Sequence, residues 1–163
     1  MAKSGKSKKD KAGGGDVIAT NRRARFEYEI LETVEAGMQL LGPEVKSLRE
    51  GRANLGDAYA IIRGGEAFLL SLHISPYEQA GRANPEPQRE RRLLLHRREI
   101  RRLAGKVAEK GLTLIPLRLY WKEGRAKVEL GLARGKRLYD KRQTVRRRET
   151  DRELARVTRQ RRR

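Results

Sequence analysis

YAIIRGGEAFLLSL, residues 59–72, is the stretch that decides how this chain folds. Two apolar runs, 59–63 and 66–72, flank the pair Gly64 and Gly65. Glycine supplies the positive φ angles that a tight two-residue hairpin turn needs. The stretch therefore predicts an antiparallel β-hairpin.

Alternation of apolar and polar residues on both sides of the hairpin predicts further strands. These expected strands are 26–37, 112–121 and 126–133, and residues 38–41 form a further apolar run. Pro116 has no backbone N–H to donate, so its strand should lie at a sheet edge or carry a bulge there.

Two stretches carry helical spacing instead. Residues 44–49 predict a short helix, and 97–110 predict a longer one that ends at Gly111. Residues 76–88 contain Pro, Gly and Asn and predict a loop.

The tally of about six strands in hairpin order, with two to three helices, predicts a mainly β domain. A small antiparallel barrel of the oligonucleotide-binding type, with helices packed at its openings, fits best, and a two-layer α+β domain is the alternative. The expected divisions are a Lys-rich leader at 1–15, a barrel domain at 16–134 and a basic tail at 135–163. Both tails are expected to be disordered in the free protein.

The formal net charge is +19, and residues 135–163 carry 13 Lys and Arg against four Asp and Glu. Such a charge attracts polyanions, which leaves nucleic acid or an anionic membrane. A membrane-surface helix needs a broad apolar face, and the tail offers too few apolar residues for one. Nucleic acid is therefore the favoured partner.

Catalytic and metal-binding signals are weak. The chain has no Cys and two His, His73 and His96, and it lacks G-x-S-x-G, Walker and dinucleotide motifs. His73 is interpreted as a structural residue of a strand. No apolar run approaches the ~20 residues that span a bilayer. These observations predict a cytoplasmic binding protein without catalytic residues, metal or cofactor.

Arginine clusters mark the expected binding surfaces, because guanidinium suits bidentate phosphate contacts. One cluster precedes the first expected strand, at 21–25, and the other surrounds the long helix. The second comprises Arg89, Arg91, Arg92, Arg97, Arg98, Arg101 and Arg102. Aromatic residues make up only 5% of the chain, and Phe26, Tyr59, Phe68 and Trp121 are expected in the core. A structured RNA, recognised by shape and phosphate geometry, fits better than a bare single strand.

Ordered sequence blocks then carry a resemblance. They are NRRAR (21–25), VEAG (34–37), EVKSLR (44–49), NLGDAY (54–59), GEAFL (65–69), RLLLHRREI (92–100), LYW (119–121) and GKRLYDKR (135–142). Together they resemble the SsrA-binding protein (small protein B) family. The resemblance implies a barrel that binds the tRNA-like domain of transfer-messenger RNA, on which alanyl-tRNA synthetase also acts. With elongation factor Tu and GTP, a monomeric protein would accompany this RNA to stalled ribosomes for trans-translation.

The resemblance also implies site residues. The expected RNA-binding set is Asn21, Arg22, Arg23, Arg25, Glu35, Lys46, Arg49, Asn54, Arg92, Leu94, His96, Arg97 and Arg98. Glu35 would accept hydrogen bonds from a base edge or 2′-hydroxyl, or orient a neighbouring Arg. Leu94 would pack against a nucleoside or, as the favoured reading, into the barrel. His96 would stack or donate a hydrogen bond.

In the tail, the family pattern implies contacts with the decoding centre and the empty mRNA channel of the ribosome. The residues concerned are Gly135, Lys136, Arg137, Tyr139, Asp140, Lys141, Arg142 and Val157. The Tyr139 ring would stack on a base of the small-subunit rRNA. From Val145 to Gln160 the tail is expected to be helical only when bound, with side-chain ion pairs Arg147–Asp151, Glu149–Arg152 and Glu153–Arg156.

Two other functions stay open from the sequence. A ribosomal or initiation-type protein with an oligonucleotide-binding barrel would bind rRNA without transfer-messenger RNA. An RNA-processing enzyme of an unrecognised kind is the other, although no pair of residues is nominated for its chemistry.

Overall fold

The fold was analysed in a computed structural model, which describes residues 16–136 and 138–161, with the side chains of 138–144 and 158–161 left out. The strands are β1 (Val17–Thr20), β2 (Tyr28–Met38), β3 (Ala53–Asn54), β4 (Tyr59–Arg63), β5 (Glu66–Leu70), β6 (His73–Ile74), β7 (Arg91–Leu94), β8 (Thr113–Lys122) and β9 (Arg125–Gly135). The helices are α1 (Ala24–Glu27), α2 (Gly42–Arg49), the 3₁₀ segment η1 (Glu78–Ala83), α3 (Arg97–Lys110) and α4 (Leu138–Arg161).

Seven strands form one antiparallel sheet in the order β1-β8-β4-β5-β7-β2-β9, and β8 also pairs with β9. The sheet thus returns on itself as a small barrel. A single residue pair, Ala60 with Leu114, joins β4 to β8, so the barrel is nearly open at that seam. This arrangement confirms the predicted mainly β barrel fold.

The central hairpin is confirmed. Arg63 pairs with Glu66, and the turn glycines Gly64 and Gly65 have φ angles of 60° and 76°. Both values lie in the left-handed region that residues with a Cβ rarely adopt. The turn therefore depends on glycine at both positions.

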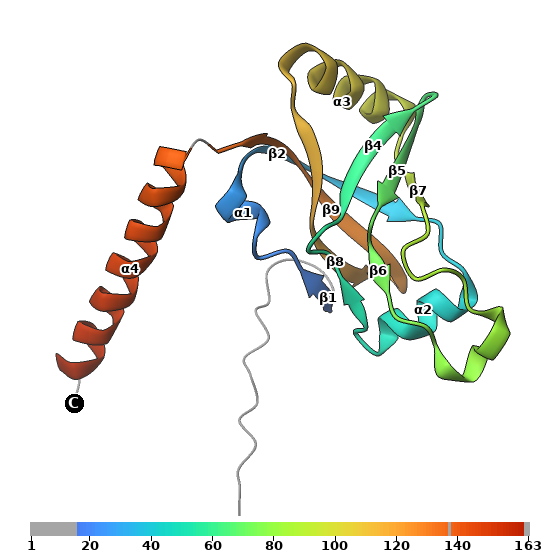
Figure 1. Cartoon of the computed structure of the whole chain (residues 1–163), viewed down its shortest axis with the longest axis horizontal. Coiled ribbons are helices and arrows are strands. Elements are labelled where there is room, and N and C mark those ends of the chain that lie inside the picture. Colours follow the sequence, from blue (N-terminus) through green and yellow to red (C-terminus); the bar gives the residue numbers. More distant parts are fainter. Residues whose placement is uncertain (1–15, 137, 162–163) are drawn as a thin grey trace, which may run out of the picture.

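The predicted long helix is confirmed from its first to its last residue, and Gly111 ends it with φ 59°. Figure 1 shows α3 and α2 at opposite ends of the barrel. Leu103 of α3 and Leu48 of α2 are both buried in the main core with Leu69, Val128 and Leu130. The two helices therefore close the two openings, as the sequence predicts.

Strand β8 carries the predicted irregularity. Its register with β9 shifts between Pro116 and Arg118. The carbonyl of Pro116 accepts a hydrogen bond from Asn21 Nδ2 at 3.1 Å. The bulge accommodates the missing N–H of proline, so this prediction is also confirmed.

Three local predictions are wrong. Phe26 lies in helix α1, and the strand begins at Tyr28, because the buried Asn21 Oδ1 accepts the Ala24 N–H and starts a helical turn. Tyr59 is 42% exposed rather than in the core. The predicted loop 76–88 contains η1.

A buried charge cluster joins α2 to β7. Arg91 is fully buried, and its Nε lies 2.6 Å from Oε2 of Glu44. Its guanidinium also donates to the carbonyls of Leu72 at 2.6 Å and Pro87 at 3.0 Å. Arg89 pairs with the same carboxylate. Arg89 and Arg91 are therefore structural, and their assignment to a binding surface is wrong.

Candidate nucleic-acid interface

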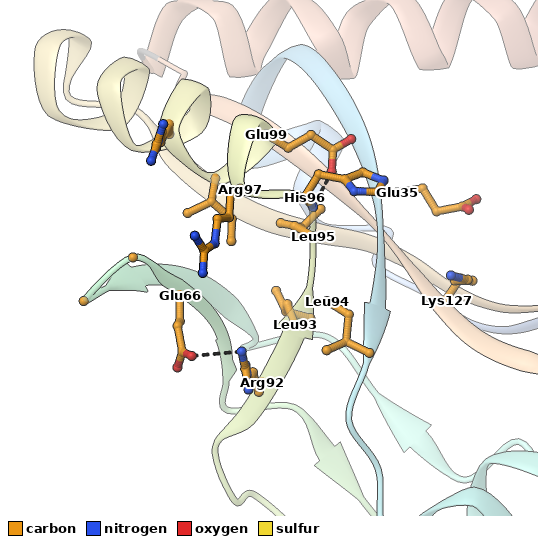
Figure 2. A pocket seen from close by; sticks show the side chains of 14 residues that line it. Glu35, Glu66, Arg92, Leu93, Leu94, Leu95, His96, Arg97, Glu99 and Lys127 are labelled. Atoms are coloured by element: carbon orange, nitrogen blue, oxygen red, sulfur yellow. Dashed lines mark hydrogen bonds and ion pairs between the residues drawn. The ribbon is translucent and has the colours of Figure 1, made fainter.

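The side chains around the start of α3 frame a groove of about 940 Å³, which we call the α3 groove. Figure 2 shows that Leu93 and Leu94 of β7, followed by Leu95, form one wall, and that His96 and Arg97 lie where the chain enters α3. Glu35 on β2 and Lys127 on β9 line the opposite wall. With Glu66 of β5, the groove collects residues from four strands and one helix.

The positions of Leu93 and Leu94 follow from strand alternation in β7. Leu93 is buried in the core, whereas Leu94 is 53% exposed beside Gly37 of β2, with which it pairs. A Cβ on Gly37 would lie 3.3 Å from the Leu94 Cβ, so glycine leaves this side chain its space. The favoured hypothesis that Leu94 packs into the barrel is wrong, because the side chain that points into the core at this end of β7 is that of Leu93.

Three arginines at the start of α3 lack neutralising partners. Within the described residues, no ion pair reaches Arg97, Arg98 or Arg101. Positive side chains in the first turn oppose the positive end of the helix dipole. Because they weaken the helix, their placement favours an external anion.

Other residues hold α3 in position. Glu99 accepts a hydrogen bond from the His96 backbone N–H at 3.1 Å (Figure 2). Glu32 of β2 binds Arg102 and, at 2.6 Å, the ammonium of Lys106. Arg102 is thus engaged with the barrel, unlike Arg97 and Arg98. The α3 groove is preorganised by these contacts.

Two side chains of β8 hold the Glu35 carboxylate in place. Its Oε2 accepts a hydrogen bond from the Tyr120 hydroxyl, and Lys122 Nζ lies 3.2 Å from its Oε1. The Tyr120 hydrogen bond, with Lys122 and Lys127, outweighs desolvation and holds the pKa of Glu35 below its ordinary 4.5. The neighbour that Glu35 engages is a lysine, so the expected orientation of an arginine is wrong. Lys122 Nζ also lies 3.3 Å from Oε2, so three of the about four acceptor sites of the carboxylate are used and about one is left for an external donor.

Burial, followed by the Glu35 carboxylate, raises the pKa of Tyr120 well above its ordinary 10. The hydroxyl therefore stays protonated and donates a hydrogen bond to Glu35. Neither Tyr120 nor Lys127 was predicted as a site residue. The outward position of Lys127, between the inward Ala126 and Val128, was visible in the strand alternation.

Of the other expected RNA-binding residues, Arg92 lies at the α3 groove, whereas Lys46, Arg49 and Asn54 lie elsewhere. Lys46 and Arg49 are exposed on α2, at the barrel end opposite α3, and Lys46 lies over the Tyr77 ring. The side chain of Asn54 accepts the Gly56 N–H at 2.8 Å. Arg92 is exposed at the α3 groove and pairs with Glu66 at 2.9 Å. The structure thus does not bring α2 together with α3.

The residues of the cluster at 21–25 differ in their surroundings. Asn21 is only 7% exposed, and its side chain donates hydrogen bonds to the carbonyls of Leu55 and Pro116. It therefore has a structural role, and its assignment to RNA binding stays a prediction. Arg23 pairs with Glu27 at 2.9 Å. Arg22 and Arg25 line a second groove, described below as the α1–α4 groove.

The root of the tail is attached to the barrel. Gly135 pairs with Tyr28 in the sheet, one residue beyond the expected domain boundary. Lys136 donates from its ammonium to the carbonyl of Arg25 at 2.9 Å. Arg137 lies outside the described residues, as do the side chains of Tyr139, Asp140, Lys141 and Arg142. Val157 is exposed on α4.

Comparison with known proteins identifies the family. The family model described as SmpB protein matches residues 18–160. The chain belongs to the SmpB protein family. An SsrA-binding protein of Trichodesmium erythraeum is 57% identical over 152 residues, which cover 92% of this chain and 97% of that protein. An SsrA-binding protein of Desulforudis audaxviator is 61% identical over 142 residues, 87% of this chain and 93% of that protein.

A solved structure agrees with this SmpB assignment. The matching chain, described as "tmRNA-SmpB: a journey to the center of the bacterial ribosome", is 55% identical. The TM-score is 0.63, and the match covers 79% of this chain and 94% of that chain. The resemblance seen in the sequence is confirmed.

Leu94 provides a test of the α3 groove. Leu94→Ala should change the free energy of unfolding by less than about 0.5 kcal/mol, because the side chain is half exposed. It should weaken RNA binding by about fivefold to tenfold if the side chain packs against a nucleoside. Urea denaturation and RNA titration measure the two effects. Leu31→Ala serves as the matched control, because Leu31 is also a half-exposed leucine but lies on β2, outside the α3 groove. It should leave the RNA affinity unchanged.

Proposed function

We propose that this chain is an RNA-binding adaptor, which binds the tRNA-like domain of transfer-messenger RNA and delivers it to stalled ribosomes for trans-translation. The observation that carries the proposal is membership of the SmpB family over nearly the whole chain, with an SmpB chain solved with tmRNA as structural neighbour. The α3 groove supplies chemistry that suits the proposal.

In the proposed complex, Arg97 and Arg98 contact RNA phosphates as bidentate donors. Leu94 packs against a nucleoside and His96 stacks or donates to a base. The remaining acceptor site of Glu35 takes a hydrogen bond from a base edge or a 2′-hydroxyl. A groove with cations, one acceptor and an apolar contact recognises a folded RNA rather than a uniform phosphate surface.

The tail is proposed to enter the decoding centre and the empty mRNA channel, with Tyr139 stacked on a small-subunit rRNA base. Within the described part of α4, none of the three expected ion pairs forms. A solvated helix with unopposed positive charge is marginally stable in water. We therefore propose that the tail is disordered in the free protein and helical among rRNA phosphates.

The proposed cycle includes elongation factor Tu with GTP and alanyl-tRNA synthetase, both acting through the same RNA. The protein would work as a cytoplasmic monomer that performs no chemistry itself. No described helix is long and apolar enough to cross a membrane.

The RNA-binding proposal can be tested with Arg97→Gln/Arg98→Gln. Losing two phosphate contacts should weaken binding to the isolated tRNA-like-domain RNA by about tenfold or more and reduce the salt slope of log K by about 2. Electrophoretic or fluorescence titration at several salt concentrations measures both quantities.

Arg82→Gln/Lys110→Gln is the matched control, since it removes the same charge from exposed positions outside the α3 groove. If the control variant lost as much affinity as Arg97→Gln/Arg98→Gln, net charge rather than the α3 groove would explain binding.

A further inference from the structure

A second cavity, the α1–α4 groove, lies between the barrel and the tail helix and has a volume of about 600 Å³. Five arginines line it, together with Thr20, Asn21, Leu117 and Glu129. The arginines are Arg22, Arg25, Arg118, Arg148 and Arg152. They come from the β1–α1 segment, from β8 and from α4, so the groove exists only when α4 lies against the barrel.

One carboxylate faces these five cations. Glu129 binds Arg118, which also lies over the Tyr120 ring. Within the described residues, no ion pair reaches Arg22, Arg25, Arg148 or Arg152. The groove therefore holds about four uncompensated positive charges, whose mutual repulsion opposes the docking of α4.

Apolar packing does not offset this repulsion. Among the side chains of α4 that the structure describes, the large apolar ones, Val145, Leu154 and Val157, are exposed. Between α4 and α1, the Arg148 guanidinium lies over the Phe26 ring, 6.0 Å from its centroid. A cation–π contact at an exposed site contributes only about 0.5–1 kcal/mol.

An anion bound in the groove would turn the electrostatic repulsion that opposes the docking of α4 into a net attraction. Guanidinium, unlike ammonium, offers a planar fork that matches phosphate oxygens, and all five cations of the groove are guanidiniums. On α4, Arg148 and Arg152 are four residues apart and lie on one face, as neighbours along the helix. Arg22 and Arg25 face them from the barrel side.

We propose that the α1–α4 groove is an RNA phosphate site shared by barrel and tail, and that phosphate bound there seats α4 on the barrel. The inference rests on the proposed RNA-binding function. It adds a coupling: RNA that reaches Arg22 and Arg25 orders the tail, and by reciprocity an ordered tail strengthens RNA binding at the barrel. The tail direction is thus set by RNA and not by the fold alone.

The distance between barrel and tail tests the inference. Because the chain has no Cys, Ala108→Cys on α3 and Ala155→Cys on α4 place two unique spin labels on exposed or partly exposed helical positions of the full chain. Double electron–electron resonance should give a broad distance distribution without RNA. A saturating short RNA duplex should narrow it to one population.

Arg22→Gln/Arg25→Gln should keep the distribution broad at saturating duplex and reduce the salt slope of binding by about 2. Arg82→Gln/Lys110→Gln, the matched control at exposed positions outside both grooves, should still narrow the distance distribution at saturation. A narrow distance distribution without RNA would overturn the inference. So would a distribution for Arg22→Gln/Arg25→Gln that narrows as much at saturating duplex as that of the unsubstituted chain. Equal narrowing by poly-glutamate would overturn it in favour of an acidic protein segment.

The duplex is not transfer-messenger RNA, so the two proposals fail separately. If the chain did not bind the tRNA-like domain but the duplex narrowed the distance distribution, the inference about the α1–α4 groove would hold and the proposed adaptor function would be wrong.

Discussion

Arg91→Met is expected to lower the free energy of unfolding by about 3–5 kcal/mol, because it removes one partner from a buried ion pair. The Glu44 carboxylate, itself buried, would lose its 2.6 Å contact with Arg91. The carbonyls of Leu72 and Pro87 would lose a donor as well. Urea denaturation measures the loss.

Arg92→Met is the neighbouring control. Arg92 is half exposed and its pair with Glu66 is a surface pair, for which about 0–1 kcal/mol is typical. Similar losses for the two variants would contradict the structural role assigned to Arg91.

The same cluster predicts a pH dependence. Burial would raise the pKa of Glu44, but hydrogen bonds from Arg89 and the Leu41 N–H and the charge of Arg91 hold the pKa below 4.5. A lowered folded-state pKa contributes stability that is present above the unfolded pKa and is lost as pH falls through the folded pKa. In Arg91→Met the Glu44 pKa should rise, so acid unfolding should begin at higher pH.

Truncation after Lys136 is expected to leave binding of the tRNA-like-domain RNA within about threefold at physiological salt, because the α3 groove is intact, and to abolish tagging on stalled ribosomes. Lys136 must be kept, since its ammonium binds the carbonyl of Arg25 and secures the end of β9. In vitro trans-translation on a message without a stop codon measures tagging.

A second variant separates charge from structure. Ala155→Pro keeps every charge of the tail but disfavours the α4 helix by about 3 kcal/mol. It should bind RNA within about threefold of the full-length chain, since the coupling between tail and barrel is lost but the α3 groove is intact, and it should lose tagging. Full tagging by either variant, or loss of RNA binding on truncation, would contradict the division of labour between barrel and tail.

Sequence reasoning succeeded where local chemistry decides the structure. Two glycines determine the hairpin turn, and the spacing of Ile100, Leu103 and Val107, followed by Gly111, determines α3. It missed β1 and misassigned Phe26, because those short elements depend on Asn21 reaching the distant carbonyls of Leu55 and Pro116. Such long-range contacts leave no periodic signal.

The site shows the same division. Residues 92–98 are neighbours in the sequence, and the structure indeed gathers most of them around the α3 groove. Sequence could not distinguish Arg91 from Arg92, or Leu93 from Leu94, because identical residues occupy both faces of β7. The α1–α4 groove was invisible, since Arg22 and Arg148 meet only through the tertiary fold.

The identity of the bound RNA tests the central claim most directly. The chain would be purified from its own cells under mild salt, and the RNA that accompanies it would be sequenced, with Arg97→Gln/Arg98→Gln purified in parallel. We predict one dominant species, transfer-messenger RNA, which is depleted from the variant. A preparation dominated by rRNA fragments, or a mixture equally abundant with the variant, would contradict the adaptor function and favour an rRNA-binding protein.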